Sequence, residues 1–440
     1  MRKTFVSIAA FFLFSSSLAA HADFRFSANL EAELRYYPSQ SLLKEQKDLF
    51  ASLAFNPQMN WQDEQRNHII NLELYGRDSR PKGNRSYADI REAYYLYAGE
   101  AWQIQAGISR VFWGVVESNH IVDIVNQSDI LASATGTEKL GQPMLSFSLE
   151  QAWGNVDFFL LPYFRKREFP DGPERFRLGL SGIDNTFNIE PVFSDKRVYY
   201  QSSRQEKHVD VALRWNHYWG GFDMAVSAFS GTSREPLPIL TDLQVGPKAI
   251  FSSYYEQLQQ LGVELQYVYD GWAFKFESAS RWQQSGDYHT VVSGFEYTFS
   301  DIAASSADVG LLVEYLWHNR KDISIEKPSL EVLDPSFTSL AAPFLRNNRI
   351  PSSYLSPFNN DIFLGMRFAL NNINGSYFLA GVIVDADDQT TAASFEGNTR
   401  LVDNLNLSLN VYVFSNASKE SAFYAFRKDD QIELKLQWYF

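Results

Sequence analysis

Apolar and polar residues alternate one by one along several segments of the chain. At the C-terminal end, Ile432, Leu434, Leu436, Trp438 and Phe440 occupy every second position. Side chains of a β-strand point to opposite faces with a period of two, so this pattern predicts a strand with one apolar face. The same alternation recurs in segments 24–35, 209–216, 272–281, 361–368 and 405–413.

The chain contains about 18 such segments, each roughly 10 to 14 residues long. Strands of globular proteins are usually about 5–6 residues long, whereas a tilted strand that crosses a bilayer needs about 9–11. After the N-terminal segment, no apolar run approaches the roughly 20 residues that a membrane-spanning helix needs. The pattern therefore predicts an all-β protein whose strands cross a membrane.

The connections between the predicted strands alternate in length, which indicates how the strands are arranged. Short links lie at 62–67, 98–100, 154–155, 220–221, 270–271, 300–307, 371–375 and 403–404. The links between them are mostly longer, at 38–48, 78–86, 114–143, 168–206, 232–256, 319–359 and 415–429, although 284–287 and 385–391 are short. Short periplasmic turns and long extracellular loops are typical of a transmembrane barrel. We predict a single closed antiparallel transmembrane β-barrel of about 18 strands (16–18).

Residues 1–22 have the composition of a secretory signal peptide. Arg2 and Lys3 precede an apolar run, and Ala20-His21-Ala22 has the small-x-small form of a cleavage site. The apolar run is too short to anchor the chain in a bilayer. We predict cleavage after Ala22, a barrel formed by residues 23–440, and location in the bacterial outer membrane. A first strand that begins at Phe24 leaves no room for an N-terminal plug domain.

The positions of the tryptophans agree with this topology. Six of them lie beside predicted periplasmic turns or at the C-terminal end: Trp61, Trp102, Trp153, Trp219, Trp272 and Trp438. We place Trp113, Trp282 and Trp317 at extracellular strand ends, and Trp215 lies further along its strand. Two aromatic belts at the two membrane interfaces are expected of a membrane barrel.

Composition excludes several classes of function. The net charge of −13 argues against a nucleic-acid partner, because nucleic-acid binding needs clustered positive charge. The absence of cysteine excludes a thiolate metal site. None of the histidines has metal-ligand spacing, and no nucleophile elbow or glycine-rich phosphate loop occurs. We expect no catalytic residue, no cofactor and no metal.

The apolar C-terminal pattern resembles the C-terminal signature of Gram-negative outer-membrane barrel proteins. In that signature the last residue is Phe and alternate preceding residues are apolar or aromatic, as Phe440, Trp438, Leu436, Leu434 and Ile432 are here. The resemblance implies that these five residues are an assembly signal for the barrel-assembly machinery. The expected environment of the barrel wall is outer-membrane lipid.

Segment 111–143 is the connection richest in candidate chemistry. It resembles loops of porin-like outer-membrane proteins of an uncharacterised family, on the matches Trp113, Gly114, Asp123, Asn126 and Asp129. Ser118 is placed to cap a short helix with an apolar side. Such a segment can fold into the barrel and narrow it, or it can fold over the mouth as an extracellular loop.

Segment 319–359 leaves similar alternatives open. Its high content of Leu, Phe and Ala suits a plug or a contact with a hydrophobic solute. The same composition suits an extracellular cap.

Charged residues on the polar faces of the strands should point into the lumen, because the apolar faces meet lipid. Opposed charges there can select solutes, or they can pair between strands and stiffen the wall. The candidates for the lumen or its constriction are His120, Asp123, Asp129, Arg35, Glu73, Arg214, Lys275, Arg281 and Arg367. The consecutive residues Ile90, Arg91 and Glu92 fit the alternation only if a β-bulge or an interfacial position accommodates them.

A barrel of about 18 strands is too wide to be filled by its wall side chains. We therefore expect a porin-like channel for passive or selective diffusion of small solutes, compatible with a homo-oligomer. The alternative is a barrel plugged by its loops that binds or exports a hydrophobic, lipid-like solute with partner proteins.

Deletion of Phe440 should lower the amount of assembled barrel in the outer membrane, because the resemblance assigns this residue to the assembly signal. The measurement is the yield of heat-modifiable barrel in outer-membrane fractions. An undiminished yield from the truncated gene would contradict the assignment.

Overall fold

A computed structural model describes residues 22–133, 136–177, 190–244, 248–324, 349–350, 352, 358–419 and 421–440. The predicted signal peptide lies outside the described residues except for Ala22. Most of segment 319–359 also lies outside them, so neither interpretation of that segment is tested.

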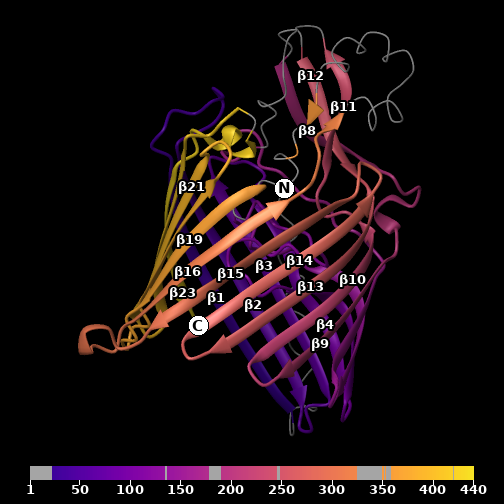
Figure 1. The fold of residues 1–440 in the computed structure, drawn as a ribbon, viewed down its shortest axis with the longest axis vertical. Helices are drawn as coiled ribbons and strands as arrows, with labels where there is room; N and C mark the ends of the chain where they lie inside the picture. The colour runs from indigo at the N-terminus through magenta and orange to yellow at the C-terminus, as the bar shows by residue number, and fades with distance from the viewer. Residues whose placement is uncertain are drawn as a thin grey trace, which may run out of the picture.

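Eighteen antiparallel strands form one sheet that closes on itself, as the sequence predicts (Figure 1). The strands are 8 to 15 residues long. They are β1 (Ala22–Tyr36), β2 (Leu49–Asp63), β3 (His68–Arg80), β4 (Tyr87–Ala98), β5 (Trp102–Ser109), β6 (Gln142–Gln151), β7 (Gly154–Leu161), β9 (Asp210–Trp219), β10 (Phe222–Thr232), β13 (Gln257–Tyr269), β14 (Trp272–Gln283), β15 (Tyr288–Phe299), β16 (Asp308–His318), β19 (Asn360–Ala369), β20 (Tyr377–Asp385), β21 (Thr391–Val402), β22 (Leu405–Ser415) and β23 (Gln431–Tyr439).

The barrel closes where the first strand pairs with the last. Strand β1 pairs with β23 from Asn29 opposite Tyr439 to Tyr36 opposite Ile432. Beyond β23, Ala28 and Phe440 exchange two backbone hydrogen bonds of 2.8 and 3.0 Å. Closure pairs the edges of the sheet, which is required of a β-structure in hydrocarbon because no water is present to bond free amides.

The two faces of the wall differ as the alternation predicts. On β1, Phe26, Leu30 and Leu34 are exposed on the outside, whereas Glu31 and Glu33 are buried inside. Exposed tryptophans lie near both ends of the wall, and Trp102, Trp219, Trp282 and Trp317 are among them. The prediction for Trp113 is wrong, because this residue is 2% exposed inside the barrel.

A β-bulge in β4 explains the irregular triplet. The register shifts so that Leu74 lies opposite Ile90 while Glu73 lies opposite Glu92. The bulge turns Arg91 and Glu92 to the same side, and Ile90 stays exposed on the outside. Of the two accommodations that the alternation left open, a bulge and an interfacial position, the structure shows the bulge.

A second, three-stranded sheet lies outside the barrel, and the sequence pattern did not predict it. Strand β12 (Lys248–Tyr255) pairs antiparallel with β11 (Leu237–Gln244) and parallel with β8 (Glu190–Tyr200). Figure 1 shows these strands beyond the rim that carries the long connections, here called the loop end. The opposite rim, with the short connections, is called the turn end.

The remaining elements are short. Strands β17 (Ile323–Ser324) and β18 (Arg349–Ile350) form a small ladder, and the 3-10 helices are η2 (Gln205–Lys207), η3 (Ile302–Ala304) and η4 (Ala422–Phe426). Over the described part of the chain, no helix has both the length and the apolar character needed to cross a membrane.

Candidate functional site

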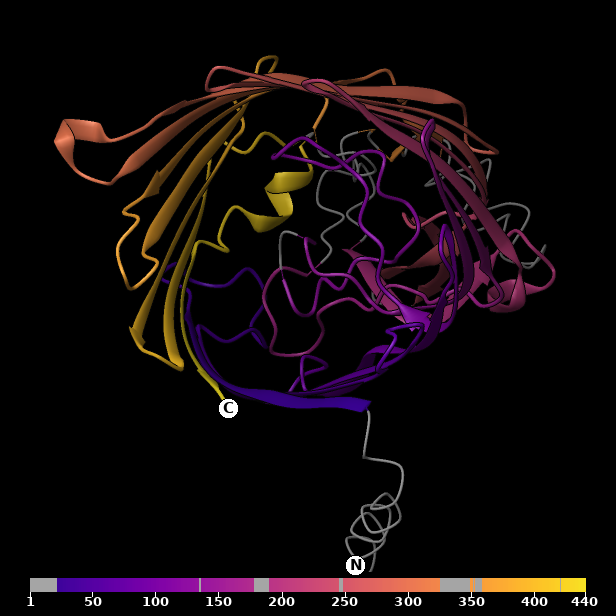
Figure 2. The ribbon, with the colours of Figure 1, turned by 90° about the horizontal axis from the view of Figure 1, so that it is seen from below.

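The connection between β5 and β6, residues 110–141, is here called loop L3, and it lies inside the ring of strands (Figure 2). Most of its apolar side chains pack against the inner wall in one buried cluster, whereas Phe112 is 58% exposed. From L3 this cluster contains Trp113, Val116, Ile121, Val122, Ile124 and Val125, and from the wall Phe159, Phe229, Leu258, Val292 and Leu316 among others. Of the two interpretations of this segment, the inward one is correct. The predicted short helix is wrong, because the described residues of L3 contain no helix.

Three buried glutamates bind the first part of L3 through its backbone. Glu264 on β13 accepts a hydrogen bond from the amide of Gly114 at 3.1 Å. Glu277 on β14 accepts from Val115 and Val116 at 2.7 and 3.1 Å. Glu314 on β16 accepts from the amides of 117 and 118, both at 2.8 Å, and from the hydroxyl of Ser118. Five consecutive backbone amides of L3 therefore donate hydrogen bonds to three carboxylates of the wall.

The next residues of L3 are held through their carbonyl oxygens. Arg281 donates to Ile121 at 2.9 Å, Gln260 donates to Val122 at 3.0 Å, and Arg234 donates to Val125 at 2.8 Å. Within L3, Asn126 donates to the carbonyls of Ser109 and Leu140, both at 2.9 Å.

The far end of L3 contacts an arginine cluster on the opposite part of the wall. Arg85 donates to the carbonyl of Leu131 at 3.0 Å, and Arg35 donates to that of Ala132 at 3.2 Å. Asp129 of L3 pairs with Arg91 at 2.7 Å and accepts from the hydroxyl of Tyr87 at 2.7 Å.

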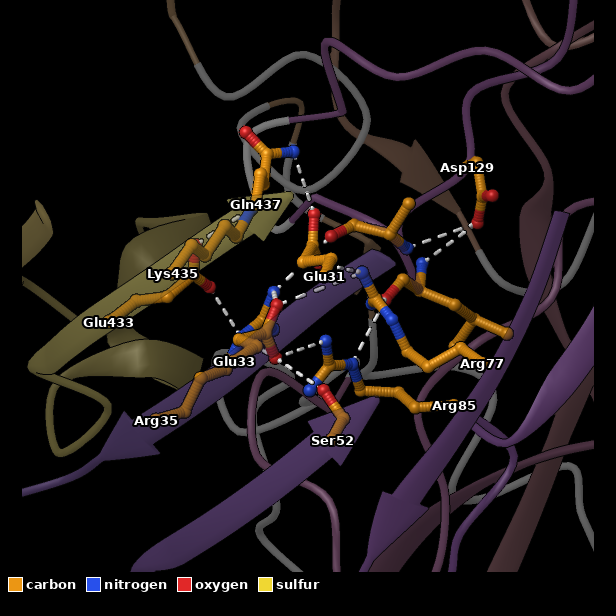
Figure 3. Close-up of polar contacts among 12 residues, drawn as sticks. Glu31, Glu33, Arg35, Ser52, Arg77, Arg85, Asp129, Glu433, Lys435 and Gln437 are labelled. Atoms are coloured by element: carbon orange, nitrogen blue, oxygen red, sulfur yellow. Dashed lines mark hydrogen bonds and ion pairs between the residues drawn. The ribbon is translucent and has the colours of Figure 1, made fainter. Parts of the chain in front are cut away.

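Carboxylates of β1 and β23 balance this arginine cluster (Figure 3). Glu33 lies between Arg35, Arg77 and Arg85, at 3.0, 3.7 and 3.0 Å. Glu433 also pairs with Arg35, and Lys435 pairs with Glu433 at 2.9 Å. A buried charge is stable only when it is paired and hydrogen-bonded, and each of these groups is paired.

Most predicted lumen residues hold L3 or the wall and do not face open water. Arg35, Arg281, Asp123 and Asp129 are buried, and Asp123 lies 3.1 Å from Lys139. Lys275 is buried between Glu117 at 2.7 Å and Glu296 at 3.4 Å. These charges are paired, as the second interpretation states, but only some pairs lie between strands: Asp129 and Lys275 pair across L3 and the wall, and Asp123 pairs with Lys139 within L3.

Four predicted residues reach solvent inside the barrel to some extent. Glu73 binds Arg110 at 2.5 Å, and Arg214 binds Glu264 at 2.8 Å. His120 lies edge-on to Phe112. Arg367 is the most exposed, with 48% of its side chain accessible, and it lies 3.3 Å from Glu117.

The solvent exposure of the inward residues shows on which side of L3 the lumen is open. Beneath L3, the inward residues Ser227, Glu264, Glu277 and Glu314 are at most 2% exposed. On strands β19 to β22, the inward residues of the middle of the wall are half-buried or exposed, and they are Gly365, Arg367, Leu379, Gly381, Ser394, Glu396, Asn410 and Tyr412. We call this side, bordered by Glu117 of L3, the passage.

Glu117, Glu264, Glu277 and Glu314 are not among the predicted constriction residues, although the alternation places the last three among the lumen-facing charges. The last three occupy inward positions beside small or apolar inward neighbours such as Gly262, Ala279 and Leu316. An acidic residue in that setting is a signal that a backbone donor comes from elsewhere. Among the described residues, no group of three or more His, Asp or Glu side chains could hold a metal ion.

Burial alters the pKa of several loop groups. Burial raises the pKa of Asp123, although Lys139 opposes the change. Burial also raises the pKa of Glu174 to about 7, although Arg85 and Arg35 lower it. Burial acts to raise the pKa of Glu235 as well. The positive charges of Arg281 and Arg320 outweigh this effect and lower the pKa of Glu235 to about 2.

Comparison with known proteins found similarity at the level of structure. No model of a known protein family matches the chain, and no curated protein does. The crystal structure of Pseudomonas aeruginosa OccK3 (OpdO) matches with a TM-score of 0.50 at 8% identity, over 95% of each chain. The chain has the fold of a porin-like outer-membrane β-barrel.

Two further matches to the porin-like barrel are weaker. A second structure of Pseudomonas aeruginosa OpdO has a TM-score of 0.49 at 10% identity, over 95% of this chain and 96% of that one. A mutant of the Rh. blastica porin has a TM-score of 0.40 at 11% identity, over 95% and 100%.

Replacing Glu314 by Ala should loosen the start of L3. The change removes the acceptor of three hydrogen bonds, and a hydrogen bond to a charged group contributes about 1.5–3 kcal/mol. Hydrogen–deuterium exchange at residues 117 and 118 should therefore become about 10- to 100-fold faster. The control is Glu396→Ala, since Glu396 faces the lumen without contacting L3 backbone. Equal exchange in both variants would contradict the anchoring role.

Glu174 should make the barrel's stability fall as pH rises. The unfolded carboxyl loses its proton near its ordinary pKa of 4.5, and the folded one near 7. Below about pH 4.5 the Glu174 carboxyl is protonated in both states, so it does not change the free energy of unfolding. Between about pH 4.5 and pH 7 that free energy decreases, and above about pH 7 it stays reduced. Glu174→Gln should raise the free energy of unfolding at pH 8 by at most about 3 kcal/mol, with no gain at pH 4.

The measurement is the unfolding midpoint of refolded protein in detergent at both pH values. Glu168→Gln, on the same segment with 45% of the side chain exposed, is the matched control. A gain that is independent of pH would rule out the titration of Glu174 as its cause.

Proposed function

We propose that the protein is an outer-membrane channel that lets small solutes diffuse through the passage beside L3. The observation that carries this proposal is the accessibility of the inward residues on β19 to β22, next to a loop that fills the other side of the lumen. A lumen partly filled by a folded-in loop limits solutes by size, and the charges on its lining select among them.

The porin-like fold supports this proposal, because the solved structure of highest TM-score among those described is that of OccK3 (OpdO). Export through a cleaved signal peptide remains the predicted route to the membrane. Contact with outer-membrane lipid fits the apolar outer wall. Assembly by the barrel-assembly machinery and homo-oligomer formation stay predictions from the sequence.

The alternative of a hydrophobic or lipid-like solute has less support. Such a solute would need apolar side chains that face the open lumen. In L3, Phe112 is 58% exposed, but the apolar side chains of the buried cluster pack against the wall, and among them Val122 and Val125 are completely inaccessible. Their contacts therefore contribute to packing and are not free to bind a solute.

Refolded protein in a planar bilayer should give discrete, stable conductance steps. Ser394→Trp should reduce the step size, because Ser394 is exposed on the inner wall of the passage and the indole would occupy part of it. Ser293→Trp is the matched control, since Ser293 is exposed on the outer face of β15, where an aromatic ring is tolerated in lipid. A correctly folded barrel that conducts no current would overturn the channel proposal.

A further inference from the structure

Over the middle and loop-end parts of the barrel, the cations of the inner wall lie within ion-pair distance of a carboxylate, although Arg35, Arg77, Arg85 and Lys435 share Glu31, Glu33 and Glu433. In the described residues, ion pairs of 4.0 Å or less involve Arg35, Arg77, Arg91, Arg110, Arg214, Lys275, Arg281, Arg367 and Lys435. The wall therefore presents little positive charge to a solute that is not already offset nearby.

Several inward carboxylates have no such partner. Asp157 on β7, Asp223 on β10 and Glu396 on β21 form no ion pair with any described residue, and each is exposed or half-buried. Asp157 lies opposite Arg214 in the ladder, but the guanidinium of Arg214 binds both carboxylate oxygens of Glu264, at 3.1 and 2.8 Å. Arg214 is thus directed to Glu264, and Asp157 is left uncompensated.

Around each partly exposed cation, the neighbouring carboxylates are at least as many as the cations. Arg110 lies 2.5 Å from Glu73 and 3.5 Å from Glu92, so two carboxylates surround one guanidinium. Arg367, the most exposed wall cation of the passage, lies between Glu117 at 3.3 Å and Glu296 at 3.8 Å. Glu117 and Glu296 also form ion pairs with Lys275. The two cations and two carboxylates of this group therefore have no net charge.

The charged residues at the turn-end rim do not reverse the excess of carboxylates over cations. Arg400 is an exposed inward cation there and has no ion pair among the described residues. The inward carboxylates Glu150 and Asp308 at the same rim are also without one. Negative charge therefore exceeds positive charge along the water-accessible wall as well as at the rim.

We propose that the lumen favours cations and solutes that carry a cationic group, and that Asp157, Asp223 and Glu396 determine this preference. The proposal rests on the channel function proposed above and specifies its solute class. A narrow aqueous path with low-dielectric walls concentrates ions of opposite sign to its lining. At the dielectric constant of water and with a Debye length of about 10 Å, an uncompensated charge about 8 Å from the ion path changes the relative occupancy of cations and anions about two-fold.

The test is the reversal potential of single channels in a gradient of potassium chloride. Wild-type protein should show the sign that corresponds to preferred K⁺ permeation. The variant Asp157→Asn, Asp223→Asn, Glu396→Gln should lower the K⁺/Cl⁻ permeability ratio by about two-fold per carboxylate. The matched control Glu100→Gln, Asp287→Asn, Asp403→Asn removes three exposed carboxylates from turns and should retain the wild-type ratio.

The outcomes separate this inference from the channel function. Conducting wild-type channels that prefer Cl⁻ or show no preference would overturn the inference and leave the channel function standing. An unchanged ratio in the lumen variant, or an equal decrease in the turn variant, would overturn the assignment to these three residues. A folded wild-type barrel without conductance would overturn both proposals.

Discussion

A chain segment inside a barrel must find hydrogen-bond partners for its buried backbone groups, and the arrangement of L3 depends on this constraint. A helix satisfies its backbone groups within the segment and a strand pairs with a neighbouring strand, but the described residues of L3 form neither, apart from one bridge between Ser128 and Lys139. Side chains of the barrel wall supply the hydrogen-bond partners that L3 does not provide for itself. Carboxylates accept from the amides of the first part, and arginine side chains donate to the carbonyl oxygens of the later parts.

The dependence is mutual, because the wall charges would be unstable without the loop. Glu277 is fully buried, and among the described residues its carboxylate has no Lys or Arg partner within 4.0 Å; the imidazole of His120 lies at 3.8 Å. An isolated carboxylate in that position would cost several kcal/mol. The amides of Val115 and Val116 replace the lost water at Oε1 of this carboxylate. Loop and wall therefore form one unit, which explains why so many lumen charges are structural and few face open water.

The sequence predicted the barrel well because the dominant signal is local. Strand number, strand direction and the bulge at Arg91 follow from the alternation of side chains and the length of connections. The position of L3 could not be predicted in the same way, since its anchors come from β13, β14 and β16, more than a hundred residues away. Trp113 was misplaced for this reason. The sheet of β8, β11 and β12 also needs pairing between distant segments.

The same distribution of residues that anchors L3 explains where the passage lies. Strands β19 to β21 present Gly365, Gly381 and Ser394 to the lumen at the level where they pair. These residues offer no carboxylate or guanidinium, and no hydrogen bond joins the nearby Glu396 or Arg367 to the described backbone of L3, so L3 is not held here as it is held against β13 to β16. Water remains on that side, and Glu396 and Arg367 stay accessible there. The position of the passage is thus a consequence of where the wall lacks anchors.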